Sequence, residues 1–199
     1  MQFQVIVADC PFRFSDSLKQ SDTKRSAQSN YDTMTMSELK SLNVKGLADP
    51  KGAVLAFWVP SSLLEGGIEV VNAWGFSVRQ TYIWVKTKKD PTDPDPNKNL
   101  GFGMGRLTRA CHEICLICIN NNGIYSKLKN KSQRSVSLAY NKGHSIKPPN
   151  LQDSLDLMFP NCLKIELFAR RERQGLITLG NQVGQCKDII TSINDTILI

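Results

Sequence analysis

The part of this sequence that most constrains the fold is a short apolar run near its start, which ends in an acid and a proline. Residues 5–8 read Val-Ile-Val-Ala and are followed by Asp9, Cys10, Pro11 and Phe12. A continuous apolar run rich in β-branched residues is typical of a strand that is buried on both faces, as in a parallel sheet. Functional groups of α/β proteins gather in the loops at the carboxyl ends of such strands. We therefore predict a buried parallel strand that presents these four residues as a small reactive loop.

The residues of this loop suit the activation of a planar amine. The exocyclic amine of a nucleobase is a poor nucleophile because its lone pair is delocalised into the ring, and two acceptors aimed at its N–H groups favour a tetrahedral nitrogen. Asp9 offers a carboxylate and Cys10 a backbone carbonyl, while Pro11 has no N–H and fixes φ near about −65°. Phe12 offers a ring that can stack on the base. The pattern is short, and a plain Asp-x-Pro turn after a strand is the alternative.

Further segments that read as strands predict the rest of a sheet. They lie at residues 53–59, 77–87, 113–119 and 164–169, with a shorter run at 177–179. Ser61 is the predicted N-cap of a helix between the first two of these strands. Its apolar stripe is made of Leu63, Leu64, Ile68, Val70 and Val71. Strand, helix and strand at this spacing indicate βαβ units, so the predicted fold class is α/β, with one mostly parallel sheet covered by helices on both faces.

Two shorter helices are predicted on either side of this block. Thr35 fits the N-cap of the first, and Glu38 three residues later completes a capping box. The second covers residues 150–159, after two prolines. The tail beyond Cys186 contains apolar residues without a period that we can interpret.

The length and charge of the chain limit what it can be. With 199 residues, of which 41% are hydrophobic, the chain can form one domain with a full core. Its net charge of +7 and its pI near 9.2 favour a polyanionic partner, whose phosphates lysine and arginine would contact. Residues 1–4 lack the basic segment of a signal peptide, and no apolar run approaches the roughly 18 residues of a membrane span. We expect a soluble, cytoplasmic protein without a membrane partner.

Six cysteines raise the question of a metal centre. Cys111, Cys115 and Cys118 have the C-x-x-x-C-x-x-C spacing that radical iron–sulfur enzymes use. Residues 113–119 read as a buried strand, however, on which Cys115 shares a face with Cys111 and Cys118 points to the other. Thiolates on opposite faces cannot meet at one cluster. We predict no metal site and interpret the cysteines as small core residues of a reducing compartment.

Three polar segments are candidates for contacts with a ligand. Residues 13–30 and 88–109 predict flexible loops. A glycine-rich run at 101–106 does not join a strand to a helix, which a dinucleotide cradle requires. Residues 125–147 are basic with interleaved tyrosines, a pattern that favours a nucleic-acid contact surface over a solvated loop. The residues that we assign to this surface are Lys127, Lys129, Lys131, Arg134 and Lys142.

Six short motifs, taken in order, resemble one family. They are Asp-Cys-Pro-Phe at 9–12, Tyr-Asp-Thr-Met at 31–34, Gly-Arg-Leu-Thr-Arg-Ala-Cys-His-Glu at 105–113, His-Ser-Ile-Lys-Pro at 144–148, Ile-Glu-Leu-Phe-Ala-Arg at 165–170 and Gly-Asn-Gln at 180–182. Each motif is weak alone, but six in the same order are specific. The chain resembles the MT-A type adenine amino-methyltransferases. That family includes the catalytic subunit of the eukaryotic mRNA adenosine methyltransferase and many small bacterial and phage DNA methyltransferases.

The resemblance implies a Rossmann-like sheet in permuted order, with the catalytic loop ahead of the cofactor-binding half, and S-adenosylmethionine as the methyl donor. It implies catalytic roles for Asp9, Cys10, Pro11 and Phe12, which match the family's Asp-Pro-Pro-Trp loop. The positions that it implies for donor binding are Asp9, Lys147, Leu167, Phe168, Arg170, Asn181 and Gln182. In the family, the matching lysine lies near the donor's carboxylate, and the matching arginine and amides hold its ribose and nearby groups.

The loop departs from the family pattern at two positions. Cys10 stands where the family usually has proline, and Phe12 where it usually has tryptophan. Because Asp9 is retained, the favoured function is methylation of the exocyclic amine of adenine in DNA. The same reaction on RNA and a non-catalytic nucleic-acid-binding subunit stay open as alternatives. The expected partner is DNA or RNA, and a second copy of the chain is a further candidate.

Overall fold

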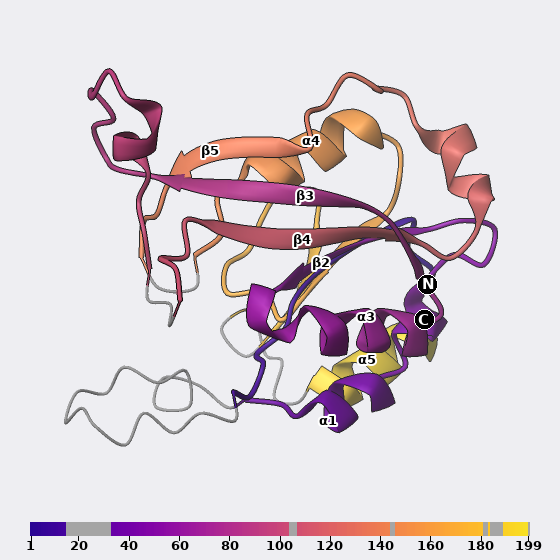
Figure 1. The fold of residues 1–199 in the computed structure, drawn as a ribbon. Coiled ribbons are helices and arrows are strands. Elements are labelled where there is room, and N and C mark those ends of the chain that lie inside the picture. The colour runs from indigo at the N-terminus through magenta and orange to yellow at the C-terminus, as the bar shows by residue number, and fades with distance from the viewer. Residues whose placement is uncertain (15–32, 104–106, 144–145, 181–182, 184–188, 199) are drawn as a thin grey trace.

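The structure is a computed structural model that describes residues 1–14, 33–103, 107–143, 146–180, 183 and 189–198. Within these residues, seven strands form one sheet in the order β5-β3-β4-β2-β1-β6-β7 (Figure 1). The strands are β1 (Val5–Asp9), β2 (Val54–Val59), β3 (Ser77–Thr87), β4 (His112–Ile119), β5 (Val136–Tyr140), β6 (Lys164–Leu167) and β7 (Ile177–Leu179). Strand β4 is antiparallel to both of its neighbours, and every other pairing is parallel.

Strand β1 lies near the middle of the sheet because it is apolar on both faces. Its residues alternate between two hydrophobic clusters: Ile6 and Ala8 pack in the first, and Val5 and Val7 in the second. It pairs in parallel with β2 on one side and with β6 on the other. The prediction of a buried parallel strand at the start of the chain is therefore confirmed.

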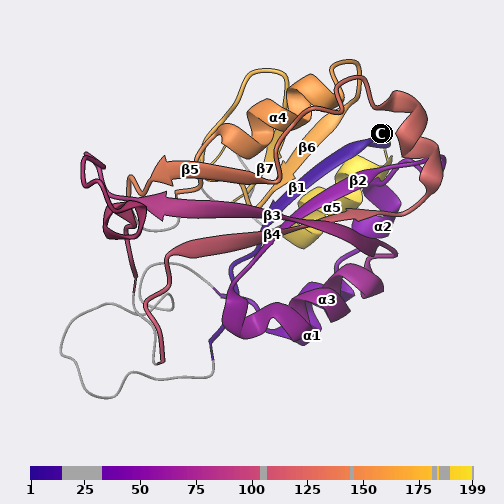
Figure 2. The same cartoon turned by 45° about the horizontal axis from the view of Figure 1, so that its top comes forward.

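Helices cover both faces of the sheet. On the first face lie α1 (Met36–Ser41), α2 (Val44–Leu47), α3 (Leu64–Ala73) and α5 (Ile189–Leu198). The second face carries α4 (Asn150–Met158) and the short 3-10 helix η4 (Asn122–Lys127) (Figures 1 and 2). Each layer is fixed by buried side chains, such as Val71 of α3 in the first cluster and Leu155 of α4 in the second. The predicted fold class, a mostly parallel α/β sheet with helices on both faces, is confirmed.

The local helix signals have mixed outcomes. The capping box at α1 is present: Glu38 N donates to Thr35 Oγ1 at 3.2 Å, and Thr35 N donates to Glu38 Oε2 at 2.7 Å. Ser61 does not cap a helix; it opens the 3-10 turn η2 (Ser61–Leu63), which leads into α3 without a side-chain cap. The predicted apolar stripe of α3 is wrong at Ile68, which is 37% exposed.

The sequence pattern missed one strand and two α-helices. Strand β5 lies inside the segment interpreted as a basic loop, and it pairs with β3 at the edge of the sheet. Helix α5 forms in the tail that showed no period, and it packs through Ile189 and Ile193. The short helix α2 was not predicted.

The cysteines and the membrane prediction can both be compared with the structure. Cys115 and Cys118 pack on opposite faces of the sheet, as predicted. No group of three or more possible metal ligands occurs in the described part of the chain. In the same part, no helix has the length and apolar character needed to cross a membrane.

Candidate active site

One edge of the sheet collects the polar groups of the candidate site. The six parallel strands all end at this edge, which we call the site edge, and the antiparallel β4 begins there. Asp9 is the last residue of β1 and pairs in register with Trp58 of β2. Glu113 lies at the start of β4, in register with Trp84 of β3. The alternation of each strand puts these residues on the second face, which α4 covers.

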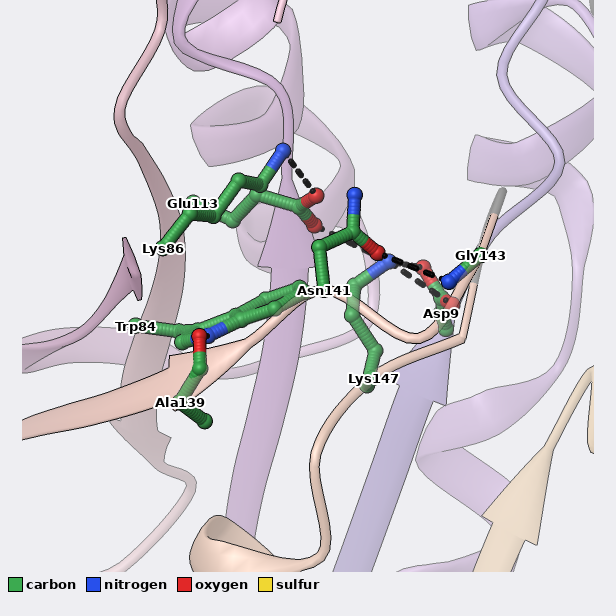
Figure 3. A network of polar contacts seen from close by, with 8 residues as sticks. All are labelled: Asp9, Trp84, Lys86, Glu113, Ala139, Asn141, Gly143 and Lys147. Atoms are coloured by element: carbon green, nitrogen blue, oxygen red, sulfur yellow. Dashed lines mark hydrogen bonds and ion pairs between the residues drawn. The ribbon is translucent and has the colours of Figure 1, made fainter. Parts of the chain in front are cut away.

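A chain of ion pairs runs across this edge (Figure 3). The Lys147 ammonium lies 2.9 Å from both Asp9 Oδ1 and Asp9 Oδ2 and 3.1 Å from Glu113 Oε2. The second oxygen of Glu113 lies 2.8 Å from the Lys86 ammonium. A lysine has three N–H donors, and all three of Lys147 have a carboxylate oxygen within reach. Lys147 therefore links the end of β1 to the start of β4.

The four charged side chains are partly shielded from water. The exposed fraction is 15% for Lys147, 21% for Asp9, 29% for Glu113 and 14% for Lys86. Burial would lower the pKa of Lys147, but Asp9 and Glu113 outweigh it and raise the pKa. Burial would raise the pKa of Glu113, and the neighbouring ammonium groups of Lys147 and Lys86 lower it instead. Both members of the Lys147–Glu113 pair thus stay charged at neutral pH.

Two indole rings support the lysines from below. The Lys147 ammonium lies 5.5 Å from the ring centre of Trp58, and the Lys86 ammonium lies 5.4 Å from that of Trp84. Such placements attract a cation to the ring face. Trp84 is fixed in turn, because its Nε1 donates to Ala139 O of β5 at 3.0 Å. The ion-pair chain therefore lies against two buried indole rings.

The backbone of the reactive loop is tied down by short hydrogen bonds. Phe12 N donates to Cys10 O at 3.0 Å, and Met34 N donates to Pro11 O at 2.7 Å. A carbonyl oxygen has two lone pairs, so Cys10 O can accept one further bond. The carboxylate of Asp9 likewise keeps accepting capacity beyond its contact with Lys147.

The side chains of the two departing positions face away from the site. Cys10 is 6% exposed and Phe12 is 4% exposed, and both belong to the first hydrophobic cluster. The Phe12 ring meets Phe57 edge-on at 5.9 Å. Burial, together with nearby Asp9, raises the pKa of the Cys10 thiol well above its usual value. The base-stacking role of Phe12 stays a prediction, and this buried ring offers no free face to a base.

The segments implied for donor binding also meet at the site edge. Leu167 ends β6 with a fully buried side chain, and Phe168 follows with a left-handed backbone at φ 62. Ala169 N donates to Leu179 O at 2.9 Å, which brings the end of β7 alongside. A Cβ on Gly180 would lie 2.1 Å from Ala169 O, so only glycine permits this close approach.

Charged side chains accompany these segments. Arg170 is half-buried just after Ala169. Glu166 lies on the same face as Asp9, and burial together with Asp9 raises its pKa. Asn181 and Gln182 lie outside the described residues. The described part of this region is therefore formed by the closely packed ends of β1, β6 and β7.

The five basic residues assigned to a nucleic-acid surface do not form one surface. Lys127 ends η4, which follows the end of β4 at Ile119, and Ile119 pairs with the first residue of β2. Lys129 N donates to Met158 O at the end of α4. Both lysines therefore lie at the edge opposite the site edge, because antiparallel β4 carries the chain there.

The remaining basic residues are distributed differently. Lys142 follows β5, whose last residue pairs with Thr87, and so lies at the site edge. Lys131 and Arg134 are exposed on the segment that returns to β5. Only Lys142 of the five is carried by a strand that ends beside Lys86.

Sequence reasoning missed Lys86 and Glu113 as members of the site. The signal was weak: Lys86 lies near the end of β3 and Glu113 near the start of β4, both on the face of the tryptophans, but β3 also contains other polar residues. Recognising the pair required the antiparallel pairing of β3 with β4, which places Val85 opposite His112. Parallel βαβ units, as predicted, would have put the start of β4 at the opposite edge.

Comparison with known proteins agrees with this architecture. Residues 3–182 match the family model MT-A70. The probable N(6)-adenosine-methyltransferase MT-A70-like of Oryza sativa is 28% identical over 184 residues, which cover 92% of this chain and 23% of that protein. The N(6)-adenosine-methyltransferase catalytic subunit METTL3 of Homo sapiens is 28% identical over 186 residues, which cover 92% and 28%.

A relative of similar length is also found. The type II methyltransferase M.MunI of Mycoplasma sp is 25% identical over 197 residues, which cover 92% of this chain and 78% of that protein. In contrast, the chain spans about a quarter of the length of the eukaryotic relatives named above. The family model matches most of the chain, including strand β1 and the Asp9 loop that follows it at the site edge. This chain therefore belongs to the MT-A70 family.

Proposed function

We propose that this chain transfers a methyl group from S-adenosylmethionine to the exocyclic N6 amine of adenine in DNA. Membership of the MT-A70 family supports the reaction class. The observation that carries the proposal is the Asp9 loop: an oriented carboxylate and the Cys10 carbonyl lie together at the carboxyl end of a central parallel strand.

Asp9 would accept one N–H of the amine and Cys10 O the other. A carboxylate has about four lone-pair sites, and Lys147 occupies one on each oxygen, so acceptor sites remain. Two acceptors on the two N–H groups favour a tetrahedral nitrogen, whose lone pair is then available for attack. Asp9 is also the carboxylate that would receive the proton which the alkylated nitrogen must lose.

Lys147 acts in this proposal as the positioning residue of Asp9. It holds both carboxylate oxygens, and through Glu113 it ties them to the neighbouring strand β4. The family resemblance gives the matching lysine a second role near the donor's carboxylate. Because the three N–H donors of Lys147 already have partners, that role requires one of these contacts to be exchanged.

S-adenosylmethionine, when bound, supplies an electrophilic methyl group on a sulfonium. The residues that would hold it are Arg170, Asn181 and Gln182, with Lys147 at its carboxylate and the backbone after Leu167 and Phe168 as a further wall. The amides suit ribose hydroxyls, because each offers both a donor and an acceptor. The close approach of Gly180 to Ala169 supports this assignment, since it brings the ends of β6 and β7 together.

The second candidate is the same reaction on RNA. Relatives whose names specify an N(6)-adenosine-methyltransferase are 28% identical to this chain, whereas M.MunI is 25% identical but matches over most of its own length. A non-catalytic subunit is disfavoured because Asp9 is retained and paired. The departures at Cys10 and Phe12 do not count against catalysis, because both side chains lie in the hydrophobic core.

The deciding experiment is incubation of the chain with DNA or RNA and S-adenosylmethionine, followed by digestion and nucleoside mass spectrometry. We expect N6-methyladenine in DNA, and an Asp9→Asn variant that is slower by at least about a hundredfold, as for loss of a proton acceptor. The matched control is Asp195→Asn, an exposed acid on α5. If only RNA is methylated, RNA replaces DNA as the proposed substrate. Turnover of Asp9→Asn within tenfold of the unmodified chain would refute the mechanism.

A further inference from the structure

A cavity of about 360 Å³ opens beside the candidate site, between the ends of β3 and β5. Figure 2 shows these two strands ending side by side. Its lining includes the lysines Lys86, Lys88 and Lys89, the aromatic rings of Phe102 and Tyr140, and the amide of Asn141. Among the described residues that line it, none is acidic. Its volume lies in the range of small-ligand sites, and its chemistry suits an anion that carries a flat apolar group.

Backbone contacts shape this cavity before any ligand arrives. Gly101 N donates to Lys86 O at 2.8 Å, and Lys88 N donates to Asn99 O at 2.8 Å, so the loop after β3 is bonded back onto the strand. A Cβ on Gly101 would lie 2.7 Å from Thr87 O, which keeps this contact for glycine. On the other side, Tyr140 pairs with Thr87 in the parallel ladder. The cavity thus has two fixed walls.

The aromatic rings of the lining are open to a partner. Tyr140 is 45% exposed and Phe102 is 68% exposed, and the Arg109 guanidinium lies 5.9 Å from the Phe102 ring centre. Exposed aromatic rings next to lysines are the usual means of holding a single nucleic-acid strand, because bases stack on the rings and phosphates meet the ammonium groups. Lys88 and Lys89 are both exposed, and so are available for a phosphate.

The cavity and the candidate site share Lys86. From this residue the ion-pair chain continues through Glu113 and Lys147 to Asp9. Strands β3 and β1 are separated in the sheet by β4 and β2, three spacings of about 4.8 Å, so the cavity lies about 14 Å from Asp9 along the site edge. A nucleic-acid strand whose target base enters at Asp9 can therefore place a neighbouring nucleotide in the cavity.

We propose that this cavity binds a nucleotide that neighbours the target adenine on the same strand, with its base against Tyr140 and Phe102 and its phosphate at Lys88 and Lys89. This inference rests on the proposed function, because it takes nucleic acid as the substrate. It places the recognition of the nucleic-acid strand at the ends of β3 and β5. The basic residues at the opposite edge, Lys127 and Lys129, have no part in it.

The test measures coupling between one ring and one base. Fluorescence anisotropy follows the binding of a single-stranded oligonucleotide with one adenine, in which each flanking position is made abasic in turn. Tyr140→Ala is expected to weaken binding of the intact oligonucleotide by about tenfold, the scale of one lost base stack. One abasic position should weaken binding to the unmodified chain by a similar factor and have no further effect on Tyr140→Ala. Phe102→Ala, on the opposite wall, is a second variant with the same expectation.

The controls separate the cavity from general charge and folding. Leu138→Ala removes an exposed side chain from the same strand outside the cavity and should leave binding unchanged. The double variant Lys88→Gln with Lys89→Gln should lower the salt slope of binding by up to about two units, and Lys127→Gln should not change it.

Three outcomes overturn the inference. The first is that Tyr140→Ala and the abasic substitution lower the affinity independently at every position. The second is absence of oligonucleotide binding. The third is displacement of the oligonucleotide by polyglutamate with the same dependence on Tyr140, which would indicate a protein partner. The proposed function fails separately. A chain that binds with the expected coupling but transfers no methyl group keeps this inference and loses the reaction, and Asp9→Asn should show that pattern.

Discussion

Removing the Lys147 ammonium should destabilise the fold more than removal of an ordinary surface charge. In Lys147→Met, the carboxylates of Asp9 and Glu113 keep their places without the cation that lies between them. Loss of one partner from a fully buried ion pair costs about 3–5 kcal/mol. These side chains are 15–29% exposed, so water screens part of the loss, and we expect about 2–4 kcal/mol.

The pH dependence of this loss tests its electrostatic origin. In the unmodified chain the pKa of Glu113 is lowered, so its contribution to stability is complete above the usual value of about 4.3 and disappears as pH falls through the lower folded value. In the variant, Glu113 loses the ammonium of Lys147, and its protonation relieves its repulsion with Asp9. The difference between the two proteins should therefore be largest near neutral pH and shrink towards pH 4.

At alkaline pH the opposite ionisation applies. The pKa of Lys147 is raised, so its contribution is complete below the usual value of about 10.4 and is lost as pH rises through the higher folded value. The measurement is guanidinium unfolding followed by circular dichroism at several pH values. The matched control is Lys40→Met, which removes a lysine from the exposed pair with Glu69 and should cost at most about 1 kcal/mol.

Two results would refute this reasoning. One is a loss in Lys147→Met no greater than in Lys40→Met at neutral pH. The other is a loss that stays constant between pH 7 and pH 4, because packing of the lysine stem would then explain it. A double variant with Asp9→Asn should recover part of the stability, since it removes the carboxylate charge that loses its cation, whereas Glu113 keeps its pair with Lys86.

Further predictions concern the packing around the site and in the core. Gly180→Ala should lower the free energy of unfolding by about 1–3 kcal/mol, because its Cβ would meet Ala169 O at 2.1 Å. Gly103→Ala, whose nearest contact would be 3.7 Å, should change it little. Thermal unfolding measures both variants, and equal effects would contradict the clash. Thr35→Ala should cost about 1 kcal/mol in the same assay by removing the cap of α1, and no loss would show that the capping box adds nothing. The Cys118 thiol, whose pKa burial raises to about 12, should resist iodoacetamide in the native protein at pH 8 and react in urea, as followed by mass spectrometry; fast native labelling would contradict its burial.

Six of the seven strands in the described residues could be predicted from the sequence. β3 was located to the residue at residues 77–87, and β1 was recognised from four apolar residues. Strand β5 was missed because its large apolar side chains, Val136, Leu138 and Tyr140, lie on the exposed face, whereas the small Ser137 and Ala139 face inward. Helix α5 was missed for a related reason, since its described buried contacts are few and lie one turn apart at Ile189 and Ile193.

The candidate site was predictable only as far as its motifs reach. Asp9 and Lys147 were named from the family resemblance, and the structure brings them into contact although 138 residues separate them. Glu113 and Lys86 join them through strand pairing, which no local pattern records. The direction of β4 also divides the basic segment, because it carries Lys127 to the opposite edge and leaves Lys142 beside the site.

The direction of β4 also makes one loop independent of the others. The segment between β3 and β4 leaves and re-enters the sheet on adjacent strands, where Val85 lies opposite His112, so its two ends stay fixed whatever its length. Lengthening such a loop is inexpensive, at about 0.6 kcal/mol for each doubling. The connection from β4 to β5, in contrast, must pass β3, because β3 lies between these two strands in the sheet. Under the proposed function, a family built on this plan can exchange the loop that meets its target strand while the carboxylate and the donor-binding edge remain untouched.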